Sequence, residues 1–234
     1  MKIGKPGAAG QEHYRNMLSV VIPTLNAAAT LGRTLTSVAE VEERLVVDGG
    51  SSDRTGALAA SLGARVLPAP RSRGSQLAAG VSAARGEWLL LLHADTRLAP
   101  GWPDVIRRHM AAETHRAGYC RFALDSDDPH ARRLERLVAW RCRMFALPYG
   151  DQGLLIHRDL LREIGGVRAL PLMEDVDLVR RLGRRRLVEL DVTAITSAEK
   201  WQRQGWYRRS LRNLLCLTLY FAGIPPRLIA RLYA

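Results

Sequence analysis

The hydrophobic pattern of this chain is clearest at residues 88–96, where a run of apolar residues ends at a single carboxylate. Four leucines, Leu89–Leu92, follow Trp88 directly. A strand that is apolar on both faces is typical of the centre of a parallel sheet covered by helices on both sides. Ligands of open α/β sheets bind beyond the carboxyl ends of such strands, and Asp95 stands at that position. An Asp after a strand can equally cap a turn or the next helix.

Short apolar runs alternate with segments of helical periodicity through the first hundred residues. The pattern predicts strands at residues 18–22, 44–47, 64–67 and 88–92, with helices at residues 30–41, 55–62 and 75–84 between them. Strands that alternate with helices of about ten residues predict βαβ units, a parallel sheet and right-handed crossovers.

After Gly101 this regular alternation is lost. The elements expected there are a helix at 102–113, a strand at 118–124, an Arg-rich helix ending near 145, a strand at 154–157 and a helix opening at 173–178. Basic amphipathic helices are expected over residues 201–234.

The composition sets limits on the fold and on the partners. With 234 residues, 47% of them hydrophobic, the chain can form one sizeable α/β domain. Its formal net charge of +12 predicts attraction to anionic partners, and nucleotides, nucleic acids and acidic lipids fit equally well. The three cysteines lie far apart without a Cys-x-x-Cys motif, so we expect neither a disulfide framework nor a zinc site.

The sequence does not predict secretion or a membrane span. Residues 1–16 are Gly-rich and polar and lack the apolar core of a secretory signal, so we expect a mobile tail there. The longest uncharged apolar run, Leu214–Ile224, falls well short of the roughly 20 residues that cross a bilayer. We therefore expect a cytoplasmic protein, either soluble or peripheral at the inner face of a membrane.

Polar side chains follow several of the predicted strands. Thr24 and Asn26 follow the first, Asp48 ends the second, and Asp95 follows the fourth. Because the carboxyl ends of parallel strands lie side by side, these residues could line one pocket. A carboxylate such as Asp48 can accept the imide N–H of a uracil, and Gly49 lets a ligand approach the backbone closely. A tight turn is the alternative explanation.

Arg71 and Arg73 precede a predicted helix whose N-terminus could hold a diphosphate together with them. Loop arginines are also commonly just solvated.

Two adjacent carboxylates, Glu174 and Asp175, open the predicted helix near residue 174. Carboxylates at a helix N-terminus complement the helix dipole, which is one explanation. Neighbouring carboxylates can also differ in pKa, which gives a base able to deprotonate a hydroxyl. Asp177 cannot share the helix face of Asp175, so we expect it to be structural.

Four motifs, in this order, resemble the family 2 glycosyltransferases of the GT-A fold. They are Val-Val-Ile-Pro-Thr-Leu-Asn (20–26), Val-Val-Asp-Gly-Gly-Ser-Ser-Asp (46–53), Leu-His-Ala-Asp-Thr (92–96) and Met-Glu-Asp-Val-Asp-Leu (173–178). The chain is most similar to a bacterial subgroup that shares Leu-His-Ala-Asp-Thr. The resemblance implies a GT-A nucleotide-diphospho-sugar transferase fold over residues 17–200, an α/β fold with a mostly parallel central sheet flanked by helices. The C-terminal helices of residues 201–234 follow it.

The resemblance also implies inverting transfer of a sugar from a nucleotide-diphosphate sugar, UDP- or GDP-linked, to an acceptor hydroxyl. Asp95 matches the last acid of the family's Asp-x-Asp motif, which binds Mn²⁺ or Mg²⁺ at the diphosphate. Asp175 matches the catalytic base, and Glu174 would support it. By position, the nucleotide-sugar contacts would be Pro23, Thr24, Asn26, Asp48, Gly49, Arg73, His93, Ala94 and Asp95, and the acceptor contacts Asp151, Gln152 and Gly153.

One position departs from the family pattern. The first acid of the usual Asp-x-Asp is His93 here, which removes a negative charge from the site. We expect its imidazole to form hydrogen bonds near the metal rather than to bind it. Direct ligation would favour Mn²⁺ over Mg²⁺.

The C-terminal segment is basic and apolar at once. Residues 200–234 hold seven basic side chains, six aromatic ones and no acidic one. Leu211, Leu214, Leu215 and Leu219 lie at helical spacing. Such a stripe packs a helix on its own domain or on a second subunit of a homodimer. It can also lie on an anionic membrane surface, near a lipid-linked acceptor.

Two other functions are compatible with the sequence. A nucleotidyltransferase would share an α/β nucleotide fold, but it favours a Gly-rich loop followed by Lys, and the lysines here are Lys2, Lys5 and Lys200. A non-catalytic basic module that binds membrane or nucleic acid fits the net charge, although no specific nucleic-acid recognition motif is evident.

Overall fold

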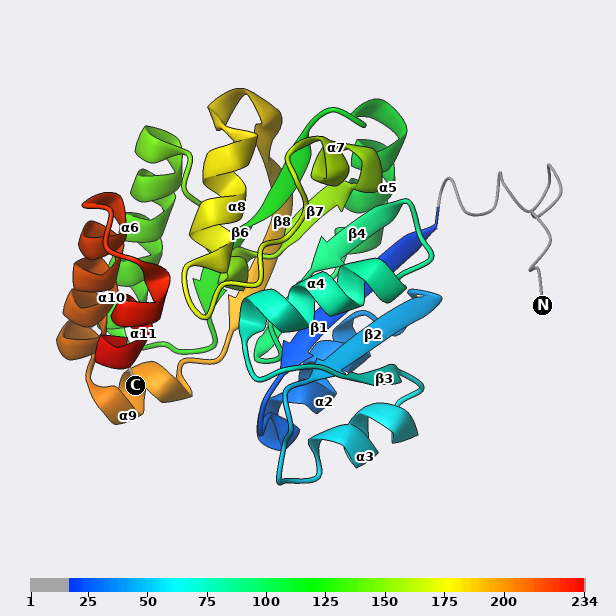
Figure 1. Cartoon of the computed structure of the whole chain (residues 1–234), viewed down its shortest axis with the longest axis horizontal. Coiled ribbons are helices and arrows are strands. Elements are labelled where there is room, and N and C mark those ends of the chain that lie inside the picture. The colour runs from blue at the N-terminus through cyan, green and yellow to red at the C-terminus, as the bar shows by residue number, and fades with distance from the viewer. Residues whose placement is uncertain (1–16, 234) are drawn as a thin grey trace, which may run out of the picture.

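The computed structural model describes residues 17–233, and the tail expected over residues 1–16 lies outside them. The described chain forms a curled sheet with helices packed on both faces, and a group of helices stands at one end (Figure 1). The sheet has eight strands in the order β3-β2-β1-β4-β7-β6-β8-β5.

The first half of the sheet is parallel. Its strands are β1 (Leu18–Thr24), β2 (Glu43–Asp48), β3 (Arg65–Pro68) and β4 (Trp88–Leu91). The helices between them are α2 (Ala28–Ser37), α3 (Thr55–Ser61) and α4 (Arg73–Ala83). All the strands and helices predicted from the alternation are therefore present, with ends shifted by a few residues.

The second half of the sheet is mixed. Its elements are β5 (Thr96–Leu98), α5 (Trp102–Ala112), β6 (Ala117–Leu124), α6 (Pro129–Phe145), the 3₁₀ turn η1 (Gly150–Gln152), β7 (Leu154–His157), α7 (Arg158–Glu163), α8 (Glu174–Leu182), the 3₁₀ turn η2 (Arg184–Arg186) and β8 (Leu187–Thr196). Strand β7 runs antiparallel to β4 and β6, and β5 runs antiparallel to β8, whereas β6 and β8 are parallel. The sequence pattern did not predict strands β5 and β8 or helix α7.

The core lies on both faces of the sheet, as the leucine run predicts. Leu89 and Leu91 of β4 belong to the apolar cluster on one face, and Trp88 and Leu90 to the cluster on the other. All four side chains are buried. Strand β4 is thus enclosed, and only its carboxyl end opens toward solvent-accessible residues such as Asp95.

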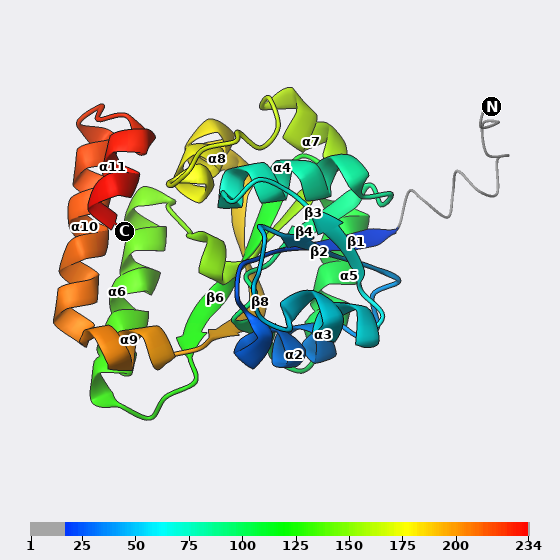
Figure 2. The same ribbon diagram turned by 60° about the horizontal axis from the view of Figure 1, so that its bottom comes forward.

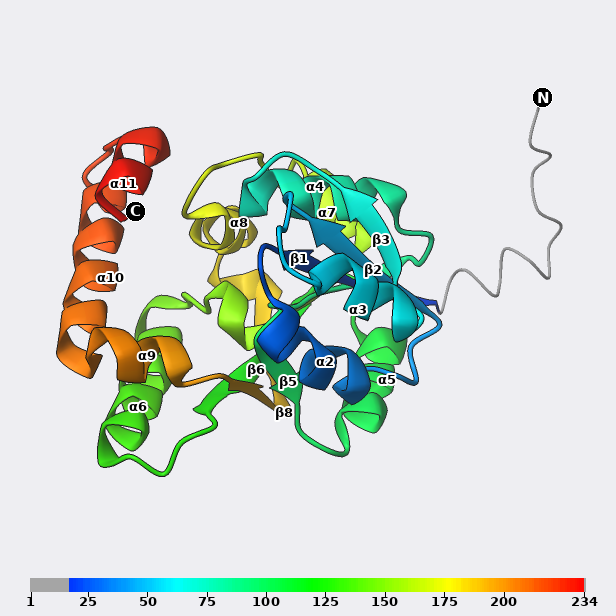
Figure 3. The ribbon, with the colours of Figure 1, turned by 90° about the horizontal axis from the view of Figure 1, so that it is seen from below.

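The chain ends in α9 (Glu199–Gln204), α10 (Trp206–Phe221) and α11 (Pro226–Tyr233). Together with α6 they stand at one end of the molecule, away from β1, β2 and β3 (Figures 2 and 3). Trp206, Leu217 and Tyr220 pack α10 against the core. Within residues 17–233, each helix is too short or too polar to cross a bilayer.

Candidate active site

Two adjoining hollows lie beyond the carboxyl ends of β1 and β4. The outer cleft has a cavity volume of about 420 Å³ and runs along the loop after β1, while the inner pocket has a cavity volume of about 140 Å³ and extends toward α8 and α10. The outer cleft has the size of a small-molecule site, typically hundreds of Å³, and the smaller inner pocket adjoins it. Arg73, His93, Asp95 and Lys200 line both hollows, so they form the boundary between the two.

The loop after β1 lines the outer cleft, and the loop after β2 holds it in place. The Asn26 side-chain oxygen accepts a hydrogen bond from the Ser52 N–H at 2.8 Å, and the Asn26 N–H donates to Ser51 Oγ at 2.8 Å. Asn26 has a positive φ of 49°. A positive φ is strained in a residue other than glycine, and the hydrogen bonds of Asn26 to Ser51 and Ser52 hold it in this conformation. Pro23, Thr24 and Asn26 line the cleft as predicted.

Asp48 shapes this wall but does not line the cleft. Its two carboxylate oxygens accept hydrogen bonds from the Ser51 and Gly50 N–H groups and from the Ser51 and Thr24 hydroxyls. Burial raises the pKa of Asp48, but these hydrogen bonds outweigh it and hold the pKa below its ordinary value. Both oxygens of Asp48 are thus already hydrogen-bonded within the protein, and its contact with a nucleobase stays a prediction.

Gly49 permits a close approach between this loop and the start of α4. A Cβ at Gly49 would lie 3.1 Å from Nε2 of Gln76, a cleft residue that the sequence reading missed. Gln76 donates to the backbone oxygens of Thr24 and Val47 at 2.6 and 2.7 Å. Gly49 is thus a packing position behind the cleft wall. Ala94 lines the cleft, and its backbone oxygen accepts from the hydroxyl of Thr34.

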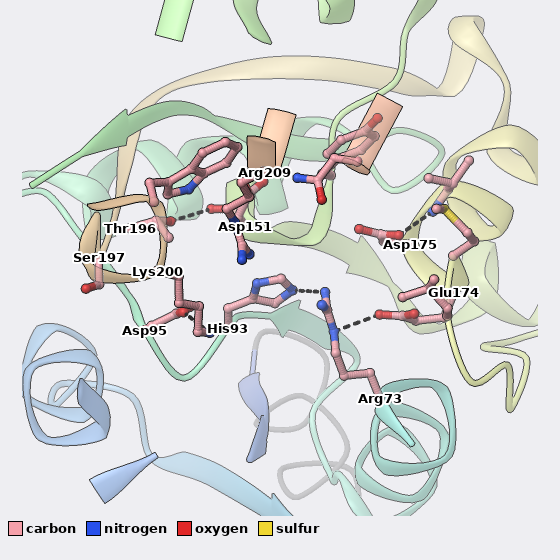
Figure 4. Close-up of a pocket in the computed structure, with 16 residues that line it drawn as sticks. Arg73, His93, Asp95, Asp151, Glu174, Asp175, Thr196, Ser197, Lys200 and Arg209 are labelled. Carbon is pink, nitrogen blue, oxygen red and sulfur yellow. Dashed lines mark hydrogen bonds and ion pairs between the residues drawn. The ribbon is translucent and has the colours of Figure 1, made fainter. Parts of the chain in front are cut away.

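Arg73, at the start of α4, lines both hollows and forms polar contacts with Glu174 and His93. Its Nε lies 2.9 Å from Glu174 Oε1, and its Nη2 lies 2.5 Å from His93 Nε2 (Figure 4). Burial and the neighbouring Arg73 charge lower the pKa of His93 to about 3. His93 is therefore uncharged at neutral pH, and its Nε2 accepts the proton of Arg73. The hydrogen bond expected of His93 is thus present, and its role toward a metal stays a prediction.

Glu174 and Asp175, the adjacent acids at the start of α8, have different surroundings. The Glu174 side chain is buried, which raises its pKa, although Arg73 opposes that effect. Asp175 accepts the Gly150 N–H at Oδ2 and the Val176 N–H at Oδ1, each at 2.8 Å, and it lines the inner pocket. A left-handed residue just before the helix, Met173 with φ 64°, sets the direction in which α8 begins.

Asp177 has the structural position that the sequence predicts. It pairs with Arg168 at 2.9 Å and with Arg181 at 2.8 Å, and it is not among the residues lining the inner pocket.

In the loop before β7, Asp151 lines the inner pocket, whereas Gln152 is buried in the protein interior. The Oδ1 atom of Asp151 is enclosed with no hydrogen-bond partner in the described structure. Burial raises the pKa of Asp151 to about 6. Gln152, in contrast, is buried behind the loop, where it bonds to the backbone of Tyr149 and Cys120. The predicted acceptor contact by Gln152 is therefore not supported, and Gly153, with φ 62°, forms the turn into β7.

Asp95 is held by a cation of the chain itself. Lys200 Nζ at the start of α9 lies 2.7 Å from Asp95 Oδ2 (Figure 4). Burial raises the pKa of Asp95, but the Lys200 ammonium outweighs that effect, so the carboxyl has a pKa below its ordinary value. Lys200 was not predicted, although it is the sole Lys of residues 17–234 among many Arg residues.

The fit to a divalent metal rests on Asp95. Within residues 17–233, no three His, Cys, Asp or Glu side chains gather closely enough to hold a metal ion by themselves. Mg²⁺ commonly binds through one or two carboxylates plus the phosphates of a substrate, so a single carboxylate is compatible with a metal that needs the ligand. The enclosed, unpartnered oxygen of Asp151 adds negative charge to the same pocket. The donor set therefore fits a metal shared with a diphosphate.

The C-terminal helices complete the inner pocket, which the sequence reading did not foresee. Trp201 of α9 and Arg209 and Asn213 of α10 line it, opposite Tyr149. Arg141 lies 3.4 Å from the centre of the Tyr149 ring and fixes that side. Helices α9 and α10 thus contribute side chains to the inner pocket.

Comparisons with known proteins agree with this architecture. Over 93 residues the chain is 40% identical to a PGL/p-HBAD biosynthesis glycosyltransferase of Mycobacterium tuberculosis, a match that covers 35% of this chain and 36% of that protein. The chain therefore matches only about a third of the length of this curated relative.

Solved structures share the fold over most of the chain. Glucosyl-3-phosphoglycerate synthase of Mycobacterium tuberculosis, in complex with Mg²⁺ and uridine-diphosphate, superposes with a TM-score of 0.62 at 20% identity, covering 95% of this chain and 86% of that one. The S. aureus TarS fragment 1–349 with UDP-GlcNAc gives a TM-score of 0.60 at 14% identity, covering 77% and 58%.

The family assignment comes from the sequence itself. The sequence pattern of the family described as Glycosyl transferase family 2 matches residues 19–168, which include the loops after β1, β2 and β4 that bound the outer cleft. This match extends over more than half of the chain. The protein therefore belongs to glycosyl transferase family 2.

Proposed function

We propose that this protein transfers a sugar, with inversion, from a nucleotide-diphosphate sugar to an acceptor hydroxyl, with Asp175 as the base. The observation that carries the proposal is the inner pocket, where Asp95 and Asp175 face one space from separate elements and Arg73 lies beside both hollows. The bound nucleotide sugars and nucleotides of the structural neighbours support this donor class.

The outer cleft would hold the nucleotide. Pro23, Thr24 and Asn26 offer backbone and small polar groups, and Arg71 and Arg73 offer charge. An Arg guanidinium binds phosphate oxygens in a forked geometry, so these arginines suit the donor's diphosphate. Glu174 keeps Arg73 oriented through their ion pair at 2.9 Å. The nucleobase, uracil or guanine, would lie against the loop that Asp48 shapes.

Asp95 would hold Mn²⁺ or Mg²⁺ together with the diphosphate, and the ion would neutralise the departing nucleoside diphosphate. Lys200 and Arg73 supply further positive charge at the same boundary. Preorganised charge of this kind stabilises a leaving group where negative charge develops.

The acceptor would enter the inner pocket. Asp175 takes the proton of the acceptor hydroxyl while that oxygen bonds to the anomeric carbon and the bond from this carbon to the phosphate oxygen breaks. The Gly150 and Val176 N–H groups orient the Asp175 carboxylate for that transfer. A single displacement from the face opposite the leaving group inverts the configuration. Asp151 and Tyr149 line the side where the acceptor would lie.

Release of sugar to water tests the base without knowledge of the acceptor. Asp175→Asn should lower hydrolysis of the preferred UDP- or GDP-sugar by about a hundredfold or more, since general base catalysis typically contributes 10²–10⁴-fold. Donor binding should persist. Asp191→Asn, which removes an exposed carboxylate on β8, is the matched control and should hydrolyse the donor normally. Normal hydrolysis by Asp175→Asn would contradict the assignment of the base.

A further inference from the structure

The apolar side chains left uncovered are gathered on a few helices. On α6 they are Leu137, Trp140, Met144 and Phe145. On α10 they are Tyr207, Leu211, Leu214, Leu215 and Phe221, and Leu228 and Leu232 follow on α11. In the part of the chain that the structure describes, the large exposed apolar residues occur only on α6 and from residue 207 onward.

The exposed residues of α10 form a continuous stripe. Tyr207, Leu211, Leu214 and Leu215 recur at intervals of three and four residues, which places them on one face of the helix. The opposite face packs inward through the buried Cys216 and through Leu217. The stripe is therefore not the side that attaches α10 to its own domain.

Helix α11 adds further exposed apolar residues next to α10. It packs beside α10 and buries Ile229, while Leu228 and Leu232 stay exposed. Figures 2 and 3 show α10 at the outer end of the molecule, with α6 and α11 beside it. We call the exposed faces of α6, α10 and α11 the outer helical surface.

The charges on this surface have one sign. Residues 200–234 contain seven basic residues and no acidic one. Arg208, Arg227 and Arg231 are exposed beside the apolar residues. On α6, Arg133, Arg136 and Arg143 are exposed, and its single acidic residue, Glu135, is bound to Arg132 at 2.7 Å.

We propose that the outer helical surface docks on an anionic lipid bilayer and holds the protein at the membrane surface. Basic residues flanking an exposed apolar face are the features with which helices lie in a membrane interface. Trp140, in edge contact with Phe145, suits the headgroup level, where tryptophan is enriched. The described helices cannot cross the bilayer, so α10 and α11 would lie along it.

The charge pattern favours lipid over a second copy of the chain. A symmetric dimer through α10 and α11 would bring the arginines of both copies together with no acidic residue in residues 200–234 to pair with them. Like charges placed face to face oppose association, whereas anionic headgroups neutralise them.

The position of the surface links it to the site. Arg209 and Asn213 line the inner pocket from the inner side of α10, while Leu211 and Leu215 lie exposed on the other side of the same helix. Docking would therefore bring one wall of the pocket within a helix diameter of the bilayer, about 10 Å.

Vesicle flotation of the full chain tests the proposal. We expect it to float with phosphatidylcholine vesicles containing phosphatidylglycerol, to stay unbound with pure phosphatidylcholine, and to bind less as salt is raised. The triple variant Arg208→Gln/Arg227→Gln/Arg231→Gln should bind the anionic vesicles roughly a hundredfold more weakly.

Matched variants show whether weaker vesicle binding comes from the outer helical surface itself, from a lower net charge or from unfolding. Arg54→Gln/Arg65→Gln/Arg108→Gln removes the same charge from exposed positions just before α3, on β3 and on α5, and should bind the anionic vesicles almost as wild type does. Leu211→Gln/Leu215→Gln should weaken binding with an unchanged circular dichroism spectrum.

Three outcomes would overturn the proposal. They are no binding to anionic vesicles, equal loss in both arginine triples, and a stable dimer in solution that Leu211→Gln/Leu215→Gln converts to monomer. None of these measurements uses a sugar donor, so their result is independent of the proposed transfer reaction.

Discussion

Replacing Lys200 with Met tests how the chain balances charge at Asp95. In the free protein Lys200 Nζ lies 2.7 Å from Asp95 Oδ2, so a metal ion approaching this carboxylate competes with the chain's own ammonium. The same ammonium lines the outer cleft and is placed to reach a diphosphate there. Lys200→Met should therefore affect metal binding and nucleotide binding in opposite directions.

The exposure of the two side chains sets the size of the effect. Asp95 has 14% of its side chain exposed and Lys200 has 56%. Sheltered hydrogen bonds between charged groups contribute about 1.5–3 kcal/mol, and exposed pairs about 0.2–1 kcal/mol. Because the lysine end is more than half exposed, we take about 1 kcal/mol, which corresponds to roughly a fivefold change in affinity.

Two titrations at pH 7.5 measure the two effects separately. Electron paramagnetic resonance of free Mn²⁺ should show about fivefold tighter Mn²⁺ binding to Lys200→Met without nucleotide. Calorimetry with UDP or GDP in EDTA should show roughly fivefold weaker binding. Lys200→Arg, which keeps the positive charge, is the control and should resemble wild type in both titrations. Unchanged Mn²⁺ affinity, or a change of the same sign in both titrations, would refute the reasoning.

Three further substitutions follow from the packing and charge around the site. Asp151→Asn should raise the free energy of unfolding by about 1–2 kcal/mol at pH 8 and leave it nearly unchanged at pH 4. The reason is that a pKa raised to about 6 makes the ionised carboxylate costly in the folded state above that pH, which urea unfolding at both pH values would reveal. Gly74→Ala should destabilise by about 1–3 kcal/mol in the same assay, because its Cβ would lie 2.6 Å from the backbone oxygen of Leu170. Gly32→Ala, with open space around it in α2, is its control and should be slightly stabilising. Gln152→Leu should cost about 1–3 kcal/mol by leaving the buried N–H of Tyr149 unpaired, and an unchanged midpoint would contradict the structural role of Gln152.

The parallel half of the fold is predictable because its local signals agree with its tertiary context. Residues 88–92 are apolar at every position, and β4 is buried on both faces. The mixed half is harder to predict. Strand β8 carries a period-two burial pattern, a signal present in the sequence, but its pairing with β6 and β5 depends on contacts distant along the chain.

In the candidate site, too, some positions could be predicted from the sequence and others could not. Asp95 and Asp175 follow a strand and open a helix, so their position in the fold could be predicted, and both line the inner pocket. The orientation of Asp48 and Gln152 depends on side-chain partners that spacing does not reveal. Lys200 reaches Asp95 from 105 residues away, a contact that no local pattern encodes.

Nucleotide-sugar binding with and without metal tests the central claim most directly. We expect one UDP- or GDP-sugar, at a hundred times its Kd with Mn²⁺, to add about 2.7 kcal/mol to the stability of the full chain. For a domain of this size that raises the melting temperature by roughly 5–10 °C. Asp95→Asn should lose most of the Mn²⁺-dependent part of this shift. No shift with any nucleotide sugar, or an equal shift in Asp95→Asn, would contradict the account.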